Sequence, residues 1–467
     1  MTYPVSELIE ALGDIPTETH ARRVQMKSRD FYWYSPILKA GLEDVTADLL
    51  VFPQSQEDIL TVLAACHDRG IPVTPRGAGT GNYGQAMPLA GGVLLDLSKM
   101  TKIRSLAHGR AIVEPGVILH ALERAARDDG RELRMFPSTV ETASVGGYIA
   151  GGSSGVGSIR WGALRDLGNI LRLRVAGMSA SPKTVELTGP DVNLAHHAYG
   201  TTGIITEIEL PLAPAVEWID MLVGFDDVVT ALRCAEQLAR ADGISLRELG
   251  AVQAPVPFDY FKRHQKFLRR EQSVLLIMVA PESVDPLLSF IDGHAGEVCF
   301  RADTASDEER KGVPAIFSLG WNHTTLRALR VDPSITYLQV GYPGPDPVAR
   351  IERMIRIFGE EVPIHVEFMR SGGEVHVSGL PLVRFSSPER LREIEAIHAA
   401  EGCPSYTPHA YTIEEGGGGH RNDAQLAFKA QMDPKGLLNP GKMIAWEDPS
   451  FDMTAGVPYA YSGLRGA

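Results

Sequence analysis

Residues 75–85 read Pro75-Arg76-Gly77-Ala78-Gly79-Thr80-Gly81-Asn82-Tyr83-Gly84-Gln85, directly after a strand-like segment at residues 71–74. The run contains the G-x-G-x-x-G pattern of dinucleotide-binding proteins, in which the last glycine opens a helix. Here Pro88 and the pair Gly91-Gly92 follow instead, and residues 93–97 have the composition of a strand. The run is therefore predicted to be a loop between two strands, whose backbone N–H groups can face an anion without a helix dipole.

Four further motifs follow this loop in order along the chain. They are Phe136-Pro137-Ser138, then Ser144-Val145-Gly146-Gly147-Tyr148-Ile149-Ala150-Gly151-Gly152-Ser153-Ser154-Gly155-Val156, then Gly200-Thr201-Thr202-Gly203-Ile204-Ile205-Thr206, and Asp433-Pro434-Lys435-Gly436-Leu437-Leu438-Asn439-Pro440-Gly441-Lys442. With an opening strand at residues 50–55, this set resembles the FAD-binding family of vanillyl-alcohol oxidase and para-cresol methylhydroxylase. Within that family it is most similar to the flavin subunits of glycolate oxidase and D-lactate dehydrogenase. Glycines that only form tight turns would have to produce all of these motifs in the same order.

The resemblance implies a fold and a cofactor. The expected fold is α+β, a two-part FAD-binding domain of the vanillyl-alcohol oxidase type with an antiparallel-sheet cap domain. FAD is expected to contact residues 75–85 and a set from the later motifs: Pro137, Ser138, Ser144, Val145, Gly146, Ala150, Gly151, Ser154, Gly155, Val156, Gly203, Ile204, Ile205 and Asn439. Some family members attach the flavin to a histidine of the loop, and Thr80 occupies the corresponding position here. The FAD is therefore expected to be non-covalent. Arg76 is interpreted as the one cation beside the loop, with a surface ion pair as its alternative role.

Composition and charge exclude several classes of function. The chain has 467 residues, 44% hydrophobic and 22% charged, which is ordinary for a soluble protein of two or three domains. Its formal net charge of −13 argues against nucleic-acid or anionic membrane partners. No signal peptide or transmembrane segment is predicted. The four cysteines are scattered, which supports neither zinc nor an iron–sulfur cluster, and Cys403 is the candidate for exposure. A cytoplasmic location is expected.

Four regions are predicted along the chain. They are an N-terminal lead-in at 1–47, an FAD-binding domain at 48–214, a substrate or cap domain at 215–420, and a C-terminal helix with a return to the FAD domain at 421–467. The boundary is placed at the proline-rich residues 211–215. Helices are predicted after the cap residues Ser55 and Asn422, and a strand is predicted at residues 335–340. Gly372-Gly373 predicts a hairpin in the cap.

A divalent metal site is not expected. The glycolate oxidase branch often carries a metal-binding histidine pair, and the nearest segment here, residues 369–376, keeps only His376. A later Glu-His of that branch is not in register within residues 415–420. The usual means of holding an α-hydroxy carboxylate is therefore expected to be missing.

Three clusters are candidates for catalysis. His365 and Glu367 alternate on one predicted strand of the hairpin, and His376 and Ser378 alternate on the other, so each pair shares a face. If both faces look at the flavin, they supply a general base and a polar clamp; the alternative is that they lie on the solvated face. His323, within residues 321–325, is a second candidate. The third cluster is formed by Tyr406, His409 and Tyr411.

The predicted function is that of an FAD-dependent dehydrogenase or oxidase, which removes a hydride from a CH–OH group of a small hydroxy acid or alcohol. One alternative is an oxidase of a phenolic or benzylic alcohol. Another is a flavin subunit of an electron-transfer complex. A small-molecule substrate is the expected partner, while the electron acceptor, a homo-oligomer and an electron-transfer partner stay open.

Overall fold

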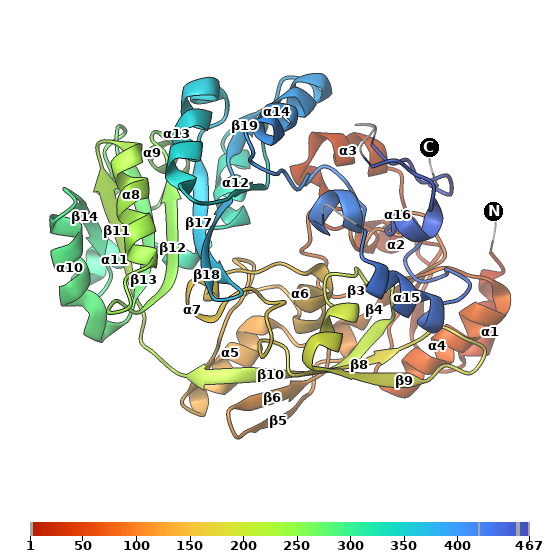
Figure 1. The fold of residues 1–467 in the computed structure, drawn as a ribbon. Helices are drawn as coiled ribbons and strands as arrows, with labels where there is room; N and C mark the ends of the chain where they lie inside the picture. The colour runs from red at the N-terminus through yellow and green to blue at the C-terminus, as the bar shows by residue number, and fades with distance from the viewer. Residues whose placement is uncertain (1–2, 419–420, 454–457, 466–467) are drawn as a thin grey trace.

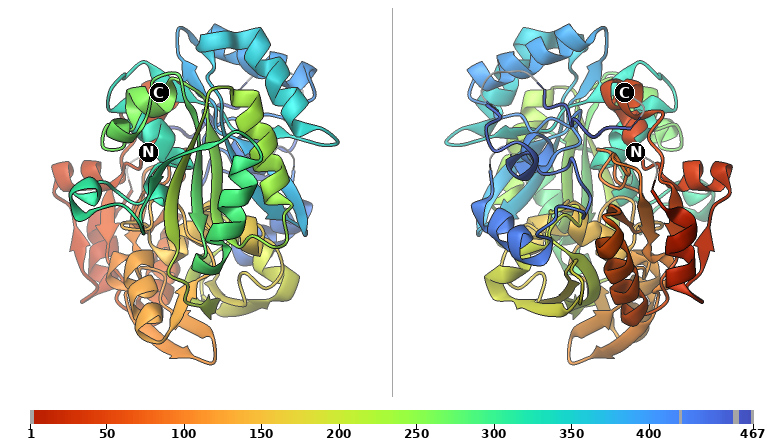
Figure 2. Two further views of the ribbon diagram at one scale, coloured as in Figure 1. Left: turned by 90° about the vertical axis from the view of Figure 1, so that its left-hand side faces the viewer. Right: turned by 90° about the vertical axis from the view of Figure 1, so that its right-hand side faces the viewer.

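The computed structural model describes residues 3–418, 421–453 and 458–465. Figure 1 shows two parts. A four-stranded sheet, a six-stranded sheet and both ends of the chain lie together, and a seven-stranded sheet with its helices forms the other part (Figures 1 and 2). This arrangement is the predicted two-part α+β fold with an antiparallel cap, and the prediction is confirmed. Among the helices of the described residues, none is both long and apolar enough to cross a bilayer.

The four-stranded sheet carries the glycine-rich loop. It has the order β1-β2-β4-β3, formed by β1 (Thr17–Glu18), β2 (Leu49–Val51), β4 (Val93–Asp96) and β3 (Val73–Arg76). β3 and β4 pair in parallel, and the segment between them, which is described throughout, contains no helix. The prediction of a loop without a crossover helix is confirmed. Helix α4 (Gln56–Arg69) connects β2 to β3, and its cap is also as predicted, because Ser55 Oγ accepts the Asp58 N–H at 3.1 Å.

Helices of the N-terminal region surround this sheet. They are α1 (Val5–Leu12), α2 (Ala21–Lys27) and α3 (Pro36–Leu42), with the short helix η1 (Tyr32–Tyr34) before α3. The side chains of Leu8 and Leu12 share an apolar core with Ile59 and Leu63 of α4. This region therefore belongs to the packing of the loop-bearing sheet.

The six-stranded sheet is antiparallel and is built around the long strand β10. Its members are β5 (Ile103–Ala107), β6 (Arg110–Val113), β7 (Arg131–Leu133), β8 (Arg172–Ala176), β9 (Thr184–Thr188) and β10 (Ile204–Pro214). Helix α5 (Leu119–Asp128) buries Leu119, Leu122 and Ala126 in the same core as β10. Two short helices follow: α6 (Val145–Gly151) lies within the motif at residues 144–156, and α7 (Ser158–Trp161) comes directly after it.

The cap sheet has the order β14-β11-β13-β12-β17-β18-β16 and is antiparallel throughout. Its strands are β11 (Ile219–Phe225), β12 (Leu246–Val252), β13 (Ser273–Val279), β14 (Glu297–Arg301), β16 (Val340–Tyr342), β17 (His365–Ser371) and β18 (Glu374–Gly379). Leu275 and Ile277 of β13 pack with the cap helices, whereas Leu276 and Met278 join the core that contains the FAD-binding sheet. Both faces of β13 are therefore buried, which explains its continuous apolar sequence.

Helices cover the cap on both sides of this sheet. They are α8 (Val228–Ala239), α9 (Val256–Tyr260), α10 (Val284–Asp292), α11 (Asp307–Arg310), α12 (Asn322–Leu329), α13 (Pro347–Phe358) and α14 (Pro388–Ala400). The hairpin of β17 and β18 turns at Gly372-Gly373, as predicted, with φ values of 57° and 87°. In this turn glycine is favoured because other residues rarely adopt positive φ.

Two expectations need correction. The predicted strand at 335–340 is interrupted: β15 (Ile335–Tyr337) pairs with β19 (Leu382–Arg384), and β16 begins only at Val340. Cys403 is fully buried, and Cys299 is the cysteine with partial exposure. In both cases, packing of neighbouring elements overrides a local composition signal. The boundary at residues 211–215 stays a prediction; β10 continues through Pro214 and pairs there with β7.

The end of the chain returns to the loop-bearing sheet. Helix α15 (Asp423–Met432) begins at Asn422, whose side chain accepts the Gln425 N–H, and the short helix α16 (Ile444–Glu447) comes after it. Between them, Leu438 forms a parallel bridge with Val73, and the Asn439 N–H donates to Val73 O at 2.9 Å. The C-terminal motif therefore extends the edge of the sheet beside β3.

Candidate functional site

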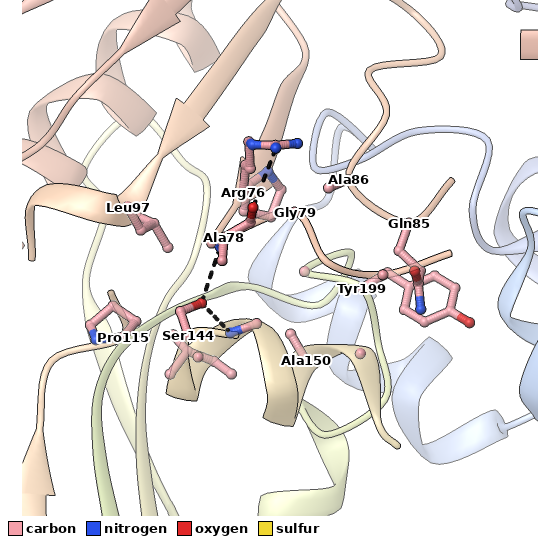
Figure 3. A pocket seen from close by; sticks show the side chains of 18 of the residues that line it. Arg76, Ala78, Gly79, Gln85, Ala86, Leu97, Pro115, Ser144, Ala150 and Tyr199 are labelled. Atoms are coloured by element: carbon pink, nitrogen blue, oxygen red, sulfur yellow. Dashed lines mark hydrogen bonds between the residues drawn. The ribbon is translucent and has the colours of Figure 1, made fainter. Parts of the chain in front are cut away.

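A cavity lies where the glycine-rich loop meets helix α6, and we call it the loop cavity (Figure 3). Most of the predicted FAD contacts line it: Pro75, Arg76, Gly77, Ala78, Gly79, Thr80, Gly81, Gln85, Ser144, Gly146, Ala150, Gly151, Gly203, Ile204 and Ile205. Ser144 connects the two elements, because its Oγ accepts the N–H groups of Ala78 and Gly147 at 3.3 Å each. Three motifs that are distant in sequence thus enclose one space.

The glycines of the loop cannot be replaced without closing this space. Gly79 has a φ of 68°, and a Cβ atom there would collide with the Arg76 guanidinium. A Cβ atom at Gly77 would collide with Ser144 Oγ. Backbone, not side chains, therefore forms this wall of the cavity, and such a wall fits a pyrophosphate that is bound by main-chain N–H groups.

Two buried cations and one buried acid surround the loop. Arg76 is not a surface residue: it is 8% exposed, and its Nη1 donates to Arg29 O at 2.7 Å. Lys442 is a second cation, which the sequence reasoning missed, and its Nζ donates to Gly84 O at 2.6 Å. Asp30 accepts the Tyr32 N–H at 3.0 Å, and burial raises its pKa while burial lowers the pKa of Lys442. The loop thus has a buried lysine and a buried acid beside it in addition to Arg76.

Other predicted FAD contacts have different positions. Asn82, Tyr83, Pro137, Ser138 and Ser154 line a second cavity. Five do not line either cavity: Gly84, Val145, Gly155, Val156 and Asn439. Asn439 supports the loop from behind, because its Nδ2 donates to Gln85 O at 2.9 Å and to Tyr199 O at 2.7 Å.

The second cavity has a volume of about 600 Å³ and opens between the FAD-binding part and the cap. We call it the interface cavity. It shares Thr80, Gly81 and Gln85 with the loop cavity, so the two are adjacent. Its walls from the cap and the preceding segments carry mostly aromatic and polar side chains: Phe31, Tyr34, Trp321, Asn322, Gln339, Tyr342, Met369, His376, Ser378 and Tyr406. A space with one end at the loop and the other among cap side chains can accept a dinucleotide and a small substrate together.

The predicted catalytic residues are not all brought together. His376 and Ser378 line the interface cavity, and His376 is exposed. His365 shares their face of the hairpin but is fully buried, with its Nε2 2.7 Å from Glu367 Oε1, and burial lowers its pKa to about 3. His323 lies outside the cavity lining on α12, and burial lowers its pKa to about 4. The Tyr411 hydroxyl donates to Tyr459 O instead of pointing into the cavity.

Sequence reasoning missed several residues of both cavities. Asp30 and Tyr199 line the loop cavity, and His196, His197 and Arg165 line the interface cavity. Burial lowers the pKa of His196 to about 3 and that of His197 to about 4. Two adjacent histidines directly before a glycine-rich motif are a signal that could have indicated the site.

A cluster of metal ligands is absent from the part of the chain that the structure describes: no three His, Cys, Asp or Glu side chains there could hold an ion together. The prediction for residues 415–420 includes His420, which lies outside the described residues. Among the residues that line the interface cavity, Arg165 is the one lysine or arginine.

Comparisons with known proteins match the part of the chain that contains the glycine-rich loop and helix α6. A family profile described as an FAD binding domain matches residues 47–178. The chain is 25% identical over 429 residues to glycolate oxidase subunit GlcD of Bacillus subtilis, covering 85% of this chain and 89% of that protein. It is 31% identical over 183 residues to D-lactate dehydrogenase of Anaerostipes hadrus, which covers 38% of each chain. The matches to GlcD of Escherichia coli and to this dehydrogenase span under half of the length of those proteins.

The fold has relatives among solved structures. The 4-ethylphenol oxidase from Gulosibacter chungangensis matches with a TM-score of 0.65 and 17% identity, covering 94% of this chain and 96% of that one. The comparisons show that the chain is an FAD-dependent oxidoreductase. The predicted resemblance to the FAD-binding family of vanillyl-alcohol oxidase and para-cresol methylhydroxylase, and within it to glycolate oxidase and D-lactate dehydrogenase flavin subunits, is confirmed.

Proposed function

We propose that this chain oxidises the CH–OH group of a small hydroxy acid or alcohol in the interface cavity. The observation that carries the proposal is the placement of His376 and Ser378, which extend from the cap hairpin into the same cavity as Pro137 and Ser138 of the FAD-binding part. The names of two relatives, glycolate oxidase and D-lactate dehydrogenase, support a hydroxy acid as the substrate class.

We assign the FAD to the two adjacent cavities. The loop cavity, with its backbone wall and the nearby Arg76 and Lys442, suits the pyrophosphate. The flavin ring belongs in the interface cavity, beside Pro137, Ser138 and Ser154. Bound there, FAD supplies the acceptor for the hydride that leaves the CH–OH carbon.

Side chains of the protein accept the proton and orient the substrate. The imidazole of His376 accepts the hydroxyl proton while the carbonyl double bond forms, and the Ser378 hydroxyl orients the substrate oxygen from the same face of β18. Arg165 supplies positive charge for a substrate carboxylate in a site without a cluster of described metal ligands. No described carboxylate forms an ion pair with Arg165, so its charge is available.

An oxidase of a phenolic or benzylic alcohol is the second candidate, and a specific observation favours it. Asn82 Nδ2 donates to the Tyr337 hydroxyl at 2.5 Å, and Gln339 bonds to the Tyr83 hydroxyl beside the interface cavity. Burial raises the pKa of Tyr83 to about 12, so its hydroxyl stays a neutral donor that can bind a phenol oxygen. The word subunit in the name of one relative also leaves an electron-transfer partner as a proposal, which co-purification would test.

The experiment that tests the function is anaerobic reduction of the bound flavin by a panel of compounds. The panel contains 2-hydroxy acids, sugar alcohols, benzylic alcohols and 4-alkylphenols. We expect 2-hydroxy acids to bleach the flavin absorbance, and reduction by the 4-alkylphenol alone would favour the second candidate. No bleaching by any CH–OH compound would contradict the proposed reaction.

A further inference from the structure

Trp321 has a backbone conformation that tryptophan rarely adopts. Its φ is 51° and its ψ is −141°, in a region that is populated almost only by glycine. Such a conformation is unfavourable and persists only when its surroundings fix it, and residues of this kind cluster at functional sites. Trp321 is partly exposed and lines the interface cavity, so its strained backbone lies at a candidate functional site.

A buried pair of carboxyl groups fixes Trp321. Its backbone N–H donates to Glu367 Oε1 at 2.6 Å, and its indole Nε1–H donates to Glu248 Oε2 at 3.4 Å. Glu248 lies on β12 and Glu367 on the neighbouring strand β17, and both are at most 2% exposed. His365 Nε2, 2.7 Å from Glu367 Oε1, completes the group.

Glycines leave room for this arrangement. A Cβ atom at Gly320 would lie 2.9 Å from Glu367 Oε1 and 3.0 Å from Glu248 Oε1, and one at Gly250 would lie 2.7 Å from Glu367 Oε2. Two adjacent carboxyl groups in a protein interior are costly, and the chemistry assigned to His376 does not use them. Their direct contact with Trp321 gives them a role in positioning the indole.

The wall that contains Trp321 is aromatic. Phe31, Tyr34, Tyr83, Tyr342 and Tyr406 line the same cavity. Trp321 packs in one apolar cluster with Tyr34, Tyr83 and Tyr337. Aromatic side chains in such a wall stabilise a bound ring by offset or edge-to-face contacts, in addition to the burial of apolar area.

We propose that Trp321 determines substrate specificity: its indole receives a ring-sized apolar substituent on the carbon that bears the hydroxyl, and the Glu248–Glu367 pair positions it. The inference rests on the proposed function, and it narrows the substrate class to hydroxy acids or alcohols with an aryl or similarly bulky group. Trp321 touches the substrate, whereas Glu248 and Glu367 act through it.

The test compares two racemic probes, mandelate and lactate, which differ in a phenyl and a methyl group. Anaerobic stopped-flow experiments on the holoenzyme give the rate constant of flavin reduction, which is divided by the Kd of the probe. We expect Trp321→Ala to lower this ratio for mandelate by about tenfold or more and to leave the ratio for lactate nearly unchanged. Trp446→Phe, outside both cavities, is the control and should change neither value. Equal losses for both probes in Trp321→Ala would overturn the proposal.

The positioning role is tested at Glu367 with two variants. Glu367→Gln keeps an acceptor for the Trp321 N–H and should keep the mandelate preference, whereas Glu367→Leu removes the acceptor and should lose most of that preference at unchanged FAD content. An equal preference in both variants would overturn this role.

Binding measured by calorimetry separates this inference from the proposed function. If neither probe reduces the flavin, the proposed reaction fails, yet mandelate should still bind the wild-type holoenzyme more tightly than lactate, and Trp321→Ala should abolish the difference. Equal binding of the two probes to the wild type would overturn the inference itself.

Discussion

The two cavities are built in different ways. In the loop cavity, the wall at Gly77 and Gly79 is backbone, and a single Cβ atom at either position would collide with a neighbouring side chain. In the interface cavity, the wall opposite the FAD-binding part consists largely of side chains that extend from separate segments of the cap and the N-terminal region. A backbone wall requires a particular residue type at each position, whereas a side-chain wall tolerates many sequences. The first cavity can therefore be predicted from sequence more readily than the second.

The nature of the FAD attachment is the first way to test the loop cavity. Thr80 lines both cavities, and we expect its hydroxyl to form no covalent bond to the flavin. We expect one FAD per chain, all of it released by acid or heat precipitation. Flavin absorbance that stays with the precipitated protein would contradict this expectation.

Gly79→Val should have the largest effect of any substitution in the loop. The side chain would be strained at a φ of 68° and would collide with the Arg76 guanidinium, so we expect the purified protein to contain almost no FAD. Gly168→Val is the matched control, because Gly168 also has a positive φ but has open space around its Cβ position. Wild-type FAD content in Gly79→Val, measured by absorbance, would place the pyrophosphate elsewhere.

A substitution in the interface cavity should affect chemistry and leave the cofactor in place. His376→Ala is expected to slow flavin reduction by about 10²-fold or more, the scale of losing a general base, with FAD content unchanged. His323→Ala is the comparison, since His323 lies outside the cavity lining. A wild-type rate in His376→Ala together with a slow rate in His323→Ala would move catalysis to helix α12.

The difference between backbone walls and side-chain walls also explains which features could be predicted from the sequence. The loop between parallel strands, the cap of α4 at Ser55 and the hairpin turn at Gly372-Gly373 were predictable, because each depends on local backbone constraints. The alternation along β17 correctly placed His365 and Glu367 on one face. It did not indicate that the face is buried at His365, since burial depends on α12 packing against it.

Long-range partners were the least predictable part of the site. Lys442 and Asp30 are 412 positions apart in sequence (442 − 30), yet each contacts the residues around Gly84 to Ala86. The sequence indicates Trp321 only as a member of the candidate segment at residues 321–325, because its backbone strain and its buried hydrogen-bond acceptors leave no local pattern. Such contacts arise from the docking of whole elements and need the fold to be known first.

The smallest expected effect concerns stability, and it sharpens the contrast between backbone and side-chain walls. Burial raises the pKa of Glu248 well above its ordinary value of 4.5, and the neighbouring Glu367 carboxyl raises it further. Burial also raises the pKa of Glu367. The folded state therefore holds protons that the unfolded chain releases above about pH 4.5, so the free energy of unfolding contributed by this pair falls as the pH rises.

Glu248→Gln imitates the protonated acid and removes its titration. Relative to wild type, its free energy of unfolding should rise with pH between 5 and 7, by up to about 1.4 kcal/mol per pH unit. The charged or titratable groups that face the pair, Arg247 and His365, are present in both proteins, so their contributions largely cancel in the difference. Urea unfolding at several pH values measures this difference, with Glu271→Gln, at an exposed position, as the control. A difference that stays constant with pH would show that the carboxyl pair ionises as freely in the fold as in the unfolded chain, and Trp321 would then be hydrogen-bonded to two charged carboxylates.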